Sequence, residues 1–213
     1  MNNRKAASIC CFTLGTVLLL SALFLVAGNL YEDRKGGETA DSVLRELKAT
    51  IPECTEPAIV TGEQYDLYAR YETVTEAAAQ QMDSIELDGK IYIGYLTIPE
   101  IALELPVQSS WSYPQLKESP CRYAGSVGNG DIVIAAHNYT SHFGKIKNLH
   151  TDSEIIFTDV SGNRNRYLVK NTEELPGTAV DQMKFGNADD WDLTLFTCTL
   201  SGQSRVTVRA VRE

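Results

Sequence analysis

The chain has 213 residues, enough for one domain of ordinary size with an appendage and too few for two large domains. Apolar residues make up 43% and charged residues 22%, close to the averages of globular proteins, which excludes a disordered or fibrous chain. The net charge of -9 at pH 7 argues against unspecific binding to nucleic acid, because the phosphates would be repelled.

From Ile9 to Gly28 the chain carries no charged side chain, and as a helix this stretch spans about 30 Å, the thickness of a bilayer core. Arg4 and Lys5 precede it, and this positive bias predicts that residues 1–8 form a cytoplasmic tail and that the bulk of the chain lies outside the membrane. The alternative is a cleaved signal peptide, because small residues stand at 26–28. The length of the apolar run favours a signal anchor over residues 9–28, and either interpretation exports the domain.

Residues 29–84 are expected to form an extracellular stalk with short helices. A polar segment with Gly36 and Gly37 comes first, and the spacing of apolar residues over 39–49 then predicts a short helix. Two prolines and little periodicity over 51–64 indicate a linker. Alanine, glutamate and glutamine accumulate without a breaker from Tyr65 to Met82, which predicts a second helix.

From residue 85 onward the pattern changes to short β-rich runs divided by turn residues. The segment DVSGNRNRY over residues 159–167, with Gly162 and Asn163 between two such runs, predicts a hairpin. The spacing predicts a mainly β sandwich or closed barrel over residues 85–213, with short helices at 114–118, 143–149 and 178–184. The expected strands lie within 90–99, 103–108, 131–138, 153–160, 165–171, 193–200 and 205–211.

Cysteine usage predicts at least one free thiol. Cys10, Cys11, Cys54, Cys121 and Cys198 form neither a CxxC pair nor an even, regular framework, so a disulfide scaffold is not expected. The first two fall in the apolar N-terminal stretch, which leaves an odd number in the exported part. A cysteine that stays unpaired outside the cytosol is a candidate for chemistry.

Cys198 ends the apolar run 193–198 and is followed by turn-forming residues, so the pattern predicts a thiol at the mouth of a strand. A cysteine in such a run is otherwise a small core residue. Cys121, in a turn-like sequence, is the reserve nucleophile, but no histidine strand or trailing arginine is arranged around it.

His137 also lies at the far end of an apolar strand, just before the polar residues 138–141. Without a partner, a histidine is most simply a hydrogen-bonded structural ring. His142 and His150 compete for a catalytic role, but both lie in a polar stretch around a predicted helix, where an exposed surface role is expected. A zinc site built from the three histidines has unsuitable spacings and no nearby carboxylate or cysteine pair.

Arg205 opens the run 205–209, seven residues after Cys198 and across a turn containing Gly202. If the two runs pair as a hairpin, Arg205 begins its strand close to where Cys198 ends the preceding one. A fixed cation there favours the thiolate and donates hydrogen bonds to a developing oxyanion. The alternative is a solvated edge arginine, like Arg209 or Arg212.

Taken together, these residues resemble a known family. The string TLFTC over residues 194–198 resembles the TLxTC signature of the sortases, the pair His137-Asn138 after an apolar strand resembles their histidine strand, and Arg205 lies on the strand after the cysteine. Phe143-Gly144 and Leu149 are similar to the family's small helix. The resemblance covers about residues 91–212 and not the first 84, where only the layout of anchor plus stalk is similar.

The resemblance implies a closed sortase-type β-barrel of seven to eight strands and a membrane-anchored cysteine transpeptidase. Cys198 is then the nucleophile, His137 the acid/base partner and Arg205 the cation on the oxyanion side. It also assigns Thr197 and Asn138 to substrate binding. Sortases cut a C-terminal signal of the LPxTG kind between threonine and glycine and pass the acyl group to an amine, which is expected here from a peptidoglycan precursor or cross-bridge. No metal or organic cofactor and no nucleic acid is required.

Departures from the family pattern bear on subclass. The turn before Arg205 is short, the chain stops at Glu213 without a second membrane helix, and no aspartate-aromatic motif precedes the barrel, which speaks against the pilin-polymerising group. The helical segment before the barrel is similar to class B, whereas the interval from Lys170 to Trp191 is short for the long helix of that class. A class B- or D-like sortase is therefore expected, with a pilin-polymerising sortase as an alternative.

Two further interpretations belong to other classes of protein. Exported L,D-transpeptidases also use cysteine and histidine on a β-rich scaffold, but their histidine-glycine pair and SxGC-like string are missing here. A non-catalytic exported surface β-module would keep Cys198 buried and inert. Thiol labelling at neutral pH distinguishes this alternative from the enzyme.

Overall fold

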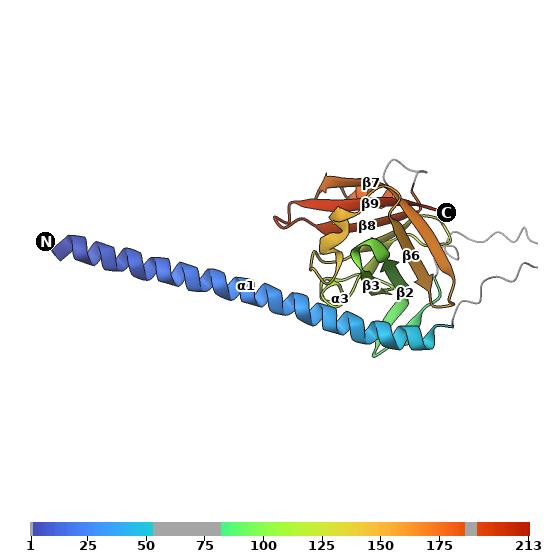
Figure 1. The fold of residues 1–213 in the computed structure, drawn as a ribbon, viewed down its shortest axis with the longest axis horizontal. Helices are drawn as coiled ribbons and strands as arrows, with labels where there is room; N and C mark the ends of the chain where they lie inside the picture. Colours follow the sequence, from blue (N-terminus) through green and yellow to red (C-terminus); the bar gives the residue numbers. More distant parts are fainter. Residues whose placement is uncertain (1, 53–81, 186–190) are drawn as a thin grey trace, which may run out of the picture.

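The computed structural model describes residues 2–52, 82–185 and 191–213. Within these ranges the chain forms one long N-terminal helix, α1 (Asn2–Thr50), and a β-barrel with short helices around it (Figure 1). Cys54 and, except for Met82, the helix expected from Tyr65 to Met82 lie outside the described residues.

Eight strands close into a barrel, as expected from the spacing of the β-rich runs. The hydrogen-bonded order is β2-β3-β4-β5-β8-β9-β7-β6, and β6 pairs with β2 to complete the ring. The additional short strand β1 forms a hairpin with β2. The strands span Ile85–Leu87 (β1), Lys90–Ile98 (β2), Leu103–Gln108 (β3), Cys121–Ala124 (β4), Ile132–Ala135 (β5), Glu154–Asp159 (β6), Arg164–Pro176 (β7), Leu193–Cys198 (β8) and Ser204–Arg212 (β9).

Each of the seven expected runs forms a strand, and the two strands without a sequence signal are the short β1 and β4. The expected hairpin joins β6 to β7, with Gly162 at a φ of 86° and the Asp159 carboxylate accepting from the backbone N–H groups of Ser161 and Asn163, both at 2.9 Å. Short helices occur at the three expected places, as α3 (Tyr113–Leu116), η2 (Phe143–Asn148) and α4 (Val180–Phe185), and a further turn, η1, spans Pro99–Ile101.

The inside of the barrel is filled by alternate side chains of its strands. On β5 and just beyond it, Ile132, Ile134 and Ala136 point into the main core, whereas Val133 and Ala135 pack in a smaller cluster outside the barrel. This alternation decides which residues at the strand ends face outward, where a substrate has access.

Helix α1 corrects the expectation of a broken stalk, because it runs without interruption through Gly36 and Gly37. A Cβ on Gly36 would lie 2.8 Å from the carbonyl oxygen of Lys117, and one on Gly37 would lie 2.9 Å from the Cβ of Ser141. The glycines therefore allow the helix to approach the barrel closely, and they do not end it. The helix expected over 39–49 is the last part of this longer helix, which buries Ala40, Leu44 and Leu47 against the barrel.

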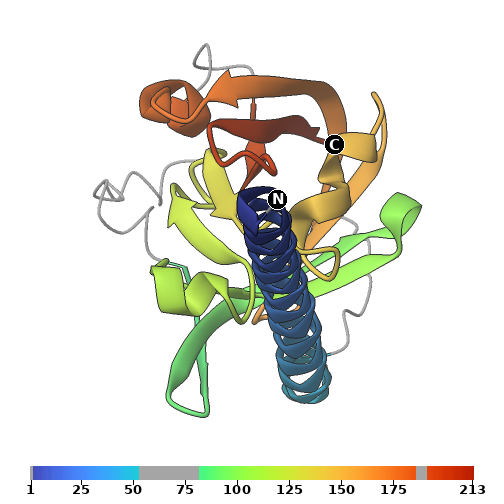
Figure 2. The same ribbon diagram turned by 90° about the vertical axis from the view of Figure 1, so that its left-hand side faces the viewer.

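The part of α1 before Asp33 is not buried against the barrel, as far as its side chains are described. From Cys11 to Tyr31 every side chain is exposed, and burial begins at Asp33 and recurs on one face of the helix down to Ile51. Within the described residues, this is the one helix long and apolar enough to cross a membrane. Figure 2, viewed from the N-terminal end, shows α1 crossing in front of one end of the barrel.

Candidate active site

Two parallel neighbouring strands end side by side at the end of the barrel nearer to the N-terminus of α1. The register of β5 and β8 aligns Ile132 with Leu193 and Ala135 with Phe196. Two further bonds continue the alignment, since the Ala136 N–H donates to the Phe196 carbonyl at 3.2 Å and the Thr197 hydroxyl donates to the Ala136 carbonyl at 2.8 Å. His137 and Cys198 are the next residues of the two chains, so the structure brings them to adjacent strand ends.

The alternation of side chains directs both residues to the outer face of the barrel. Ala136 points into the core, which turns His137 outward, and Phe196 packs in the outer cluster, which turns Cys198 to the same side. Both are half-buried. A thiol and an imidazole on one outer face can reach a bound peptide together.

Arg205 stands directly opposite Cys198 in the antiparallel pair of β8 and β9. Residues paired in this way project to the same face of a sheet, so Arg205 also lies on the outer side. Its Nη1 donates to the backbone carbonyls of Gly202 and Ser204, both at 3.0 Å, which holds the half-buried guanidinium beside the turn between the two strands. The sequence-predicted thiol, imidazole and guanidinium therefore come from three adjoining strand ends.

The imidazole of His137 lies against the ring of Tyr139, with ring centroids 4.8 Å apart and an angle of 18° between the planes. Its Nε2 is buried and makes no hydrogen bond within the described residues. Burial lowers the pKa of His137, the Lys117 cation lowers it further, and the Glu32 carboxylate opposes them. The ring is thus neutral around pH 7 and has a nitrogen available to exchange a proton.

A cavity of about 470 Å³ adjoins the thiol, between the loop after β5 and the β8–β9 hairpin. Thr197 and Asn138, the two predicted substrate-binding residues, both line it, together with Cys198. Thr197 is buried, and its hydroxyl is already bonded to the Ala136 carbonyl, so it also joins the ends of β5 and β8. Polar and apolar side chains share the lining, which fits an extended peptide. The remaining neighbours include Thr140, Phe143, Glu174, Leu200 and Val206.

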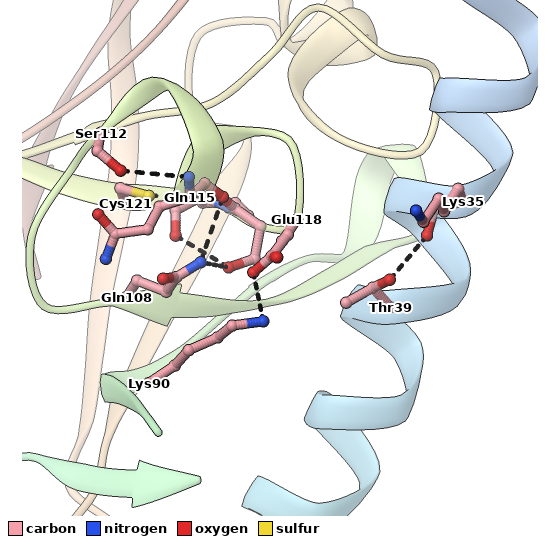
Figure 3. Close-up of polar contacts among 10 residues, drawn as sticks. Lys35, Thr39, Lys90, Gln108, Ser112, Gln115, Glu118 and Cys121 are labelled. Atoms are coloured by element: carbon pink, nitrogen blue, oxygen red, sulfur yellow. Dashed lines mark hydrogen bonds and ion pairs between the residues drawn. The ribbon is translucent and has the colours of Figure 1, made fainter. Parts of the chain in front are cut away.

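Cys121 does not compete with Cys198 as a nucleophile. Figure 3 shows it enclosed by the loop that carries Ser112 and Gln115, beside Gln108. It is fully buried, its sulfur contacts the Ser119 carbonyl at 3.5 Å, and burial raises its pKa to about 12. A thiol in this state stays protonated and inaccessible.

Two interpretations of single side chains were wrong. His142, expected at the surface, is fully buried between the loop after β5 and Gly36 of α1. Arg209, compared above with solvated edge arginines, is only 1% exposed and bonds to Glu173, Met183 and Thr194, so it fastens α4 to the strands. Both are buried by elements distant in sequence, namely α1 and α4. His150 is exposed, as expected, and its Nδ1 bonds to Glu100 at 2.7 Å.

Sequence reasoning missed three residues that surround His137, namely Tyr139, Lys117 and Glu32. Tyr139 stands two residues from the histidine and could have been suspected from that spacing alone. Lys117 belongs to the α3 loop and Glu32 to α1, and the two form an ion pair of 3.0 Å. No local pattern identifies residues that meet only when α1 lies against the barrel.

The comparisons with known proteins concern the family and the fold. The Sortase domain model matches residues 96–213. No curated protein sequence matches the chain. Among solved structures, a sortase C from Clostridium perfringens with the C-terminal cell wall sorting motif is similar at 26% identity and a TM-score of 0.51, over 57% of this chain and 70% of that one.

Two further structures are similar over more of the chain. A Clostridium perfringens sortase D5 transpeptidase has 16% identity and a TM-score of 0.56, over 83% of this chain and 99% of its own. A Streptococcus pneumoniae sortase C has 19% identity and a TM-score of 0.53, over 86% of this chain and 89% of its own. At these identities the likeness concerns the fold.

Proposed function

The chain belongs to the sortase family, and from that premise we propose that it is a membrane-anchored cysteine transpeptidase that cleaves an LPxTG-like sorting signal and joins the released acyl group to a cell-wall amine. The catalytic domain is residues 85–213, residues 9–28 span the membrane, and residues 1–8 lie in the cytoplasm. Residues 29–84 are the stalk, of which the part from Asp33 to Ile51 packs on the barrel.

One observation carries the proposal: His137, Cys198 and Arg205 stand on three adjoining strand ends, on one outer face and beside a cavity that Cys198 lines. Reactive groups at the ends of rigid strands are held at fixed separations, which a two-step acyl transfer needs. A surface module with no chemistry gives no reason for a half-exposed thiol and, at the same edge, an imidazole nitrogen with no hydrogen-bond partner in the part of the chain that the structure describes.

The first half of the reaction forms a thioester. Neutral His137 takes the proton of the Cys198 thiol, the resulting thiolate attacks the threonine carbonyl of the signal, and the negative oxygen that develops accepts hydrogen bonds from Arg205. When the intermediate collapses, the carbon–nitrogen bond breaks and protonated His137 gives its proton to the departing glycine amine. The acyl group remains on the sulfur.

The second half regenerates the enzyme. An acceptor amine attacks the thioester carbonyl, neutral His137 takes the proton that the amine loses, and the new amide forms as the thiolate leaves and regains its proton from His137. The acceptor is expected from a peptidoglycan precursor or cross-bridge. A pilin-polymerising role, in which the amine belongs to another protein subunit, is a second candidate, since the similar structures include a Streptococcus pneumoniae sortase C described in connection with pilin substrate specificity.

The test is a peptide-library assay with the full chain in detergent, read by mass spectrometry with and without added amine. We expect Cys198→Ala to abolish cleavage and transfer, His137→Ala to lose nearly all activity, and Arg205→Ala to leave a folded but severely impaired enzyme. The loss of one oxyanion donor corresponds to about 10²- to 10³-fold in kcat. Full transpeptidation by Cys198→Ala would reject the mechanism, and the amine that is accepted identifies the acceptor class.

Thiol labelling separates the enzyme from a non-catalytic surface module. At neutral pH we expect iodoacetamide to modify Cys198 in the folded chain and to spare Cys121, which is fully buried. The Cys198→Ala variant serves as the control for labelling at other positions. Equal resistance of both thiols would favour the surface module.

A further inference from the structure

The stalk helix makes a set of contacts with the loop that carries His137. The Asp33 carboxylate of α1 accepts hydrogen bonds from the backbone N–H groups of Thr140 and Ser141, both at 3.0 Å, and from the Ser141 hydroxyl at 2.6 Å. The Ser141 hydroxyl also donates to the Asp33 carbonyl at 2.9 Å. Two charge-assisted backbone bonds fix the path of the loop three and four residues after the histidine.

The preceding residue of α1 reaches the same loop by a second route. Glu32 accepts a hydrogen bond from the Tyr139 hydroxyl at 3.1 Å and pairs with Lys117 at 3.0 Å. Burial and the adjoining Glu32 raise the pKa of Tyr139 to about 12, so its hydroxyl keeps the proton that it donates. The ring of the same tyrosine stacks on the imidazole of His137.

The close approach of α1 is built into the backbone. Gly36 lies over the buried His142 and the Lys117 carbonyl, and Gly37 lies against Ser141. The loop itself turns tightly, because the N–H groups of His142 and Gly144 both donate to the Tyr139 carbonyl, at 3.0 and 2.9 Å. Hydrogen bonds within the loop and hydrogen bonds to α1 therefore both hold the loop in place, and His137 lies near its start.

We propose that Glu32 and Asp33 of the stalk helix are positioning residues for His137: Asp33 fixes the loop, and Glu32 fixes the tyrosine ring against which the imidazole rests. The inference rests on the proposed function, since His137 is there the acid/base group. It makes α1 part of the catalytic apparatus as well as the membrane anchor.

A double-mutant cycle in the full chain tests the inference, with a fluorogenic LPxTG-type peptide as the probe. Glu32→Gln removes the charge, and Tyr139→Phe removes the hydroxyl and keeps the stacked ring. We expect each to lower kcat about tenfold with KM unchanged, as expected for misplacement of a reacting group. Tyr139→Phe removes this hydrogen bond, and Glu32→Gln replaces its charged acceptor by a weaker neutral one. Because both act on the same interaction, the double variant should lose no more than the poorer single variant. Asp33→Asn should also lower kcat at constant KM.

The matched control is Glu38→Gln on the same helix, because Glu38 is 66% exposed and pairs with Arg34 on the solvent side of α1. It should leave kcat and KM unchanged. If a substitution only damaged the structure, the loss of activity would follow the loss of folded enzyme. The thermal midpoint of each variant is therefore measured alongside its kinetics. Additive losses in the cycle, or the same kinetics for Glu32→Gln and Glu38→Gln, would overturn the proposal.

A second readout does not depend on turnover. Glu32 is an anion near His137, so Glu32→Gln should lower the pKa of the imidazole, measured by NMR titration of the histidine ring with His137→Gln for assignment. An unchanged titration would overturn the role of Glu32 by itself. If wild type fails to process any sorting peptide but this titration shifts as expected, the proposed function fails and the contact between α1 and the histidine loop stands.

Discussion

The buried imidazole of His142 lies where α1 packs on the barrel, and its protonation state makes the stability of the fold depend on pH. It is fully buried, with Gly36 of α1 above it. Burial lowers the pKa of His142 to about 4, and nearby His137 lowers it too, whereas the carbonyls of Gly36 and Glu118 and the Asp33 carboxylate oppose the shift. The residue therefore stays neutral in the folded chain at ordinary pH.

This shift predicts a loss of stability in mild acid. The unfolded chain binds a proton at this histidine near pH 6.5 and the folded chain only near pH 4, so the stabilisation is complete above about pH 6.5 and disappears as the pH falls toward 4. The full change is about 3 kcal/mol for a shift of this size. Denaturant unfolding of the full chain at pH 7.5 and 4.5 measures it.

The pH dependence should be smaller in His142→Gln, whatever that variant does to stability at pH 7.5. His150→Gln is the control, since it changes an exposed histidine. If wild type and His142→Gln lose the same stability between the two pH values, the shift assigned to His142 is wrong.

At the scale of elements, α1 and the barrel meet along one helical face that begins at Asp33 and ends at Ile51. Three apolar residues of this face are almost fully buried, namely Ala40, Leu44 and Leu47. At Gly36 and Gly37 the helix backbone lies close against the loops of the barrel. Each glycine lowers the intrinsic stability of a helix by about 1 kcal/mol relative to alanine, so the packing has to offset that cost.

Replacing Gly36 by alanine should therefore loosen the contact, even though alanine favours the helix itself. The added Cβ would lie 2.8 Å from the Lys117 carbonyl oxygen, a backbone atom that cannot move aside alone. Gly28→Ala is the matched control, because a Cβ there meets nothing within 4 Å and brings the same gain in helix propensity. We expect faster amide hydrogen exchange at Thr140 and Ser141 in Gly36→Ala than in Gly28→Ala. Equal protection in the two variants would show that the helix does not depend on this approach.

At the scale of the whole molecule, one continuous helix connects the apolar N-terminal stretch to the end of the barrel that carries the proposed active site. Figure 1 shows the β8–β9 turn on the side of the barrel that faces the N-terminus of α1. If residues 9–28 lie in the membrane, as proposed, the proposed active site faces the bilayer and lies close to it, since the first hydrogen bonds from α1 to the barrel are made by Glu32 and Asp33. A substrate still held in the membrane would meet the groove from that side.

Lengthening α1 between the span and the barrel should therefore affect tethered substrates selectively. A seven-residue helical insertion after Leu30 raises the barrel by about 10 Å and nearly preserves its rotation, because seven residues make close to two turns. In lipid vesicles, we expect unchanged cleavage of a soluble sorting peptide and slower cleavage of the same peptide fused to a transmembrane helix. Equal rates for both substrates would contradict the proposed orientation.

Much of the fold follows from local patterns in the sequence. Period-two alternation and turn residues located seven strands and the β6–β7 hairpin, because these signals depend on neighbours in the chain. The strands β1 and β4 were missed, since three or four residues are too few for a pattern. Cys198, His137 and Arg205 were each identifiable at a strand end, and the resemblance to sortases supplied their expected roles.

The sequence by itself determined the β-domain, its family and the residues most suited to its chemistry, because periodicity and the TLFTC string are local properties. Only the tertiary structure decided that Gly36 and Gly37 continue a helix, that His142 and Arg209 are buried, and that Glu32 and Asp33 reach the histidine loop. These facts depend on α1 and α4 packing against strands far away in the chain. A contact between residues about a hundred positions apart leaves no mark on the local pattern of either one.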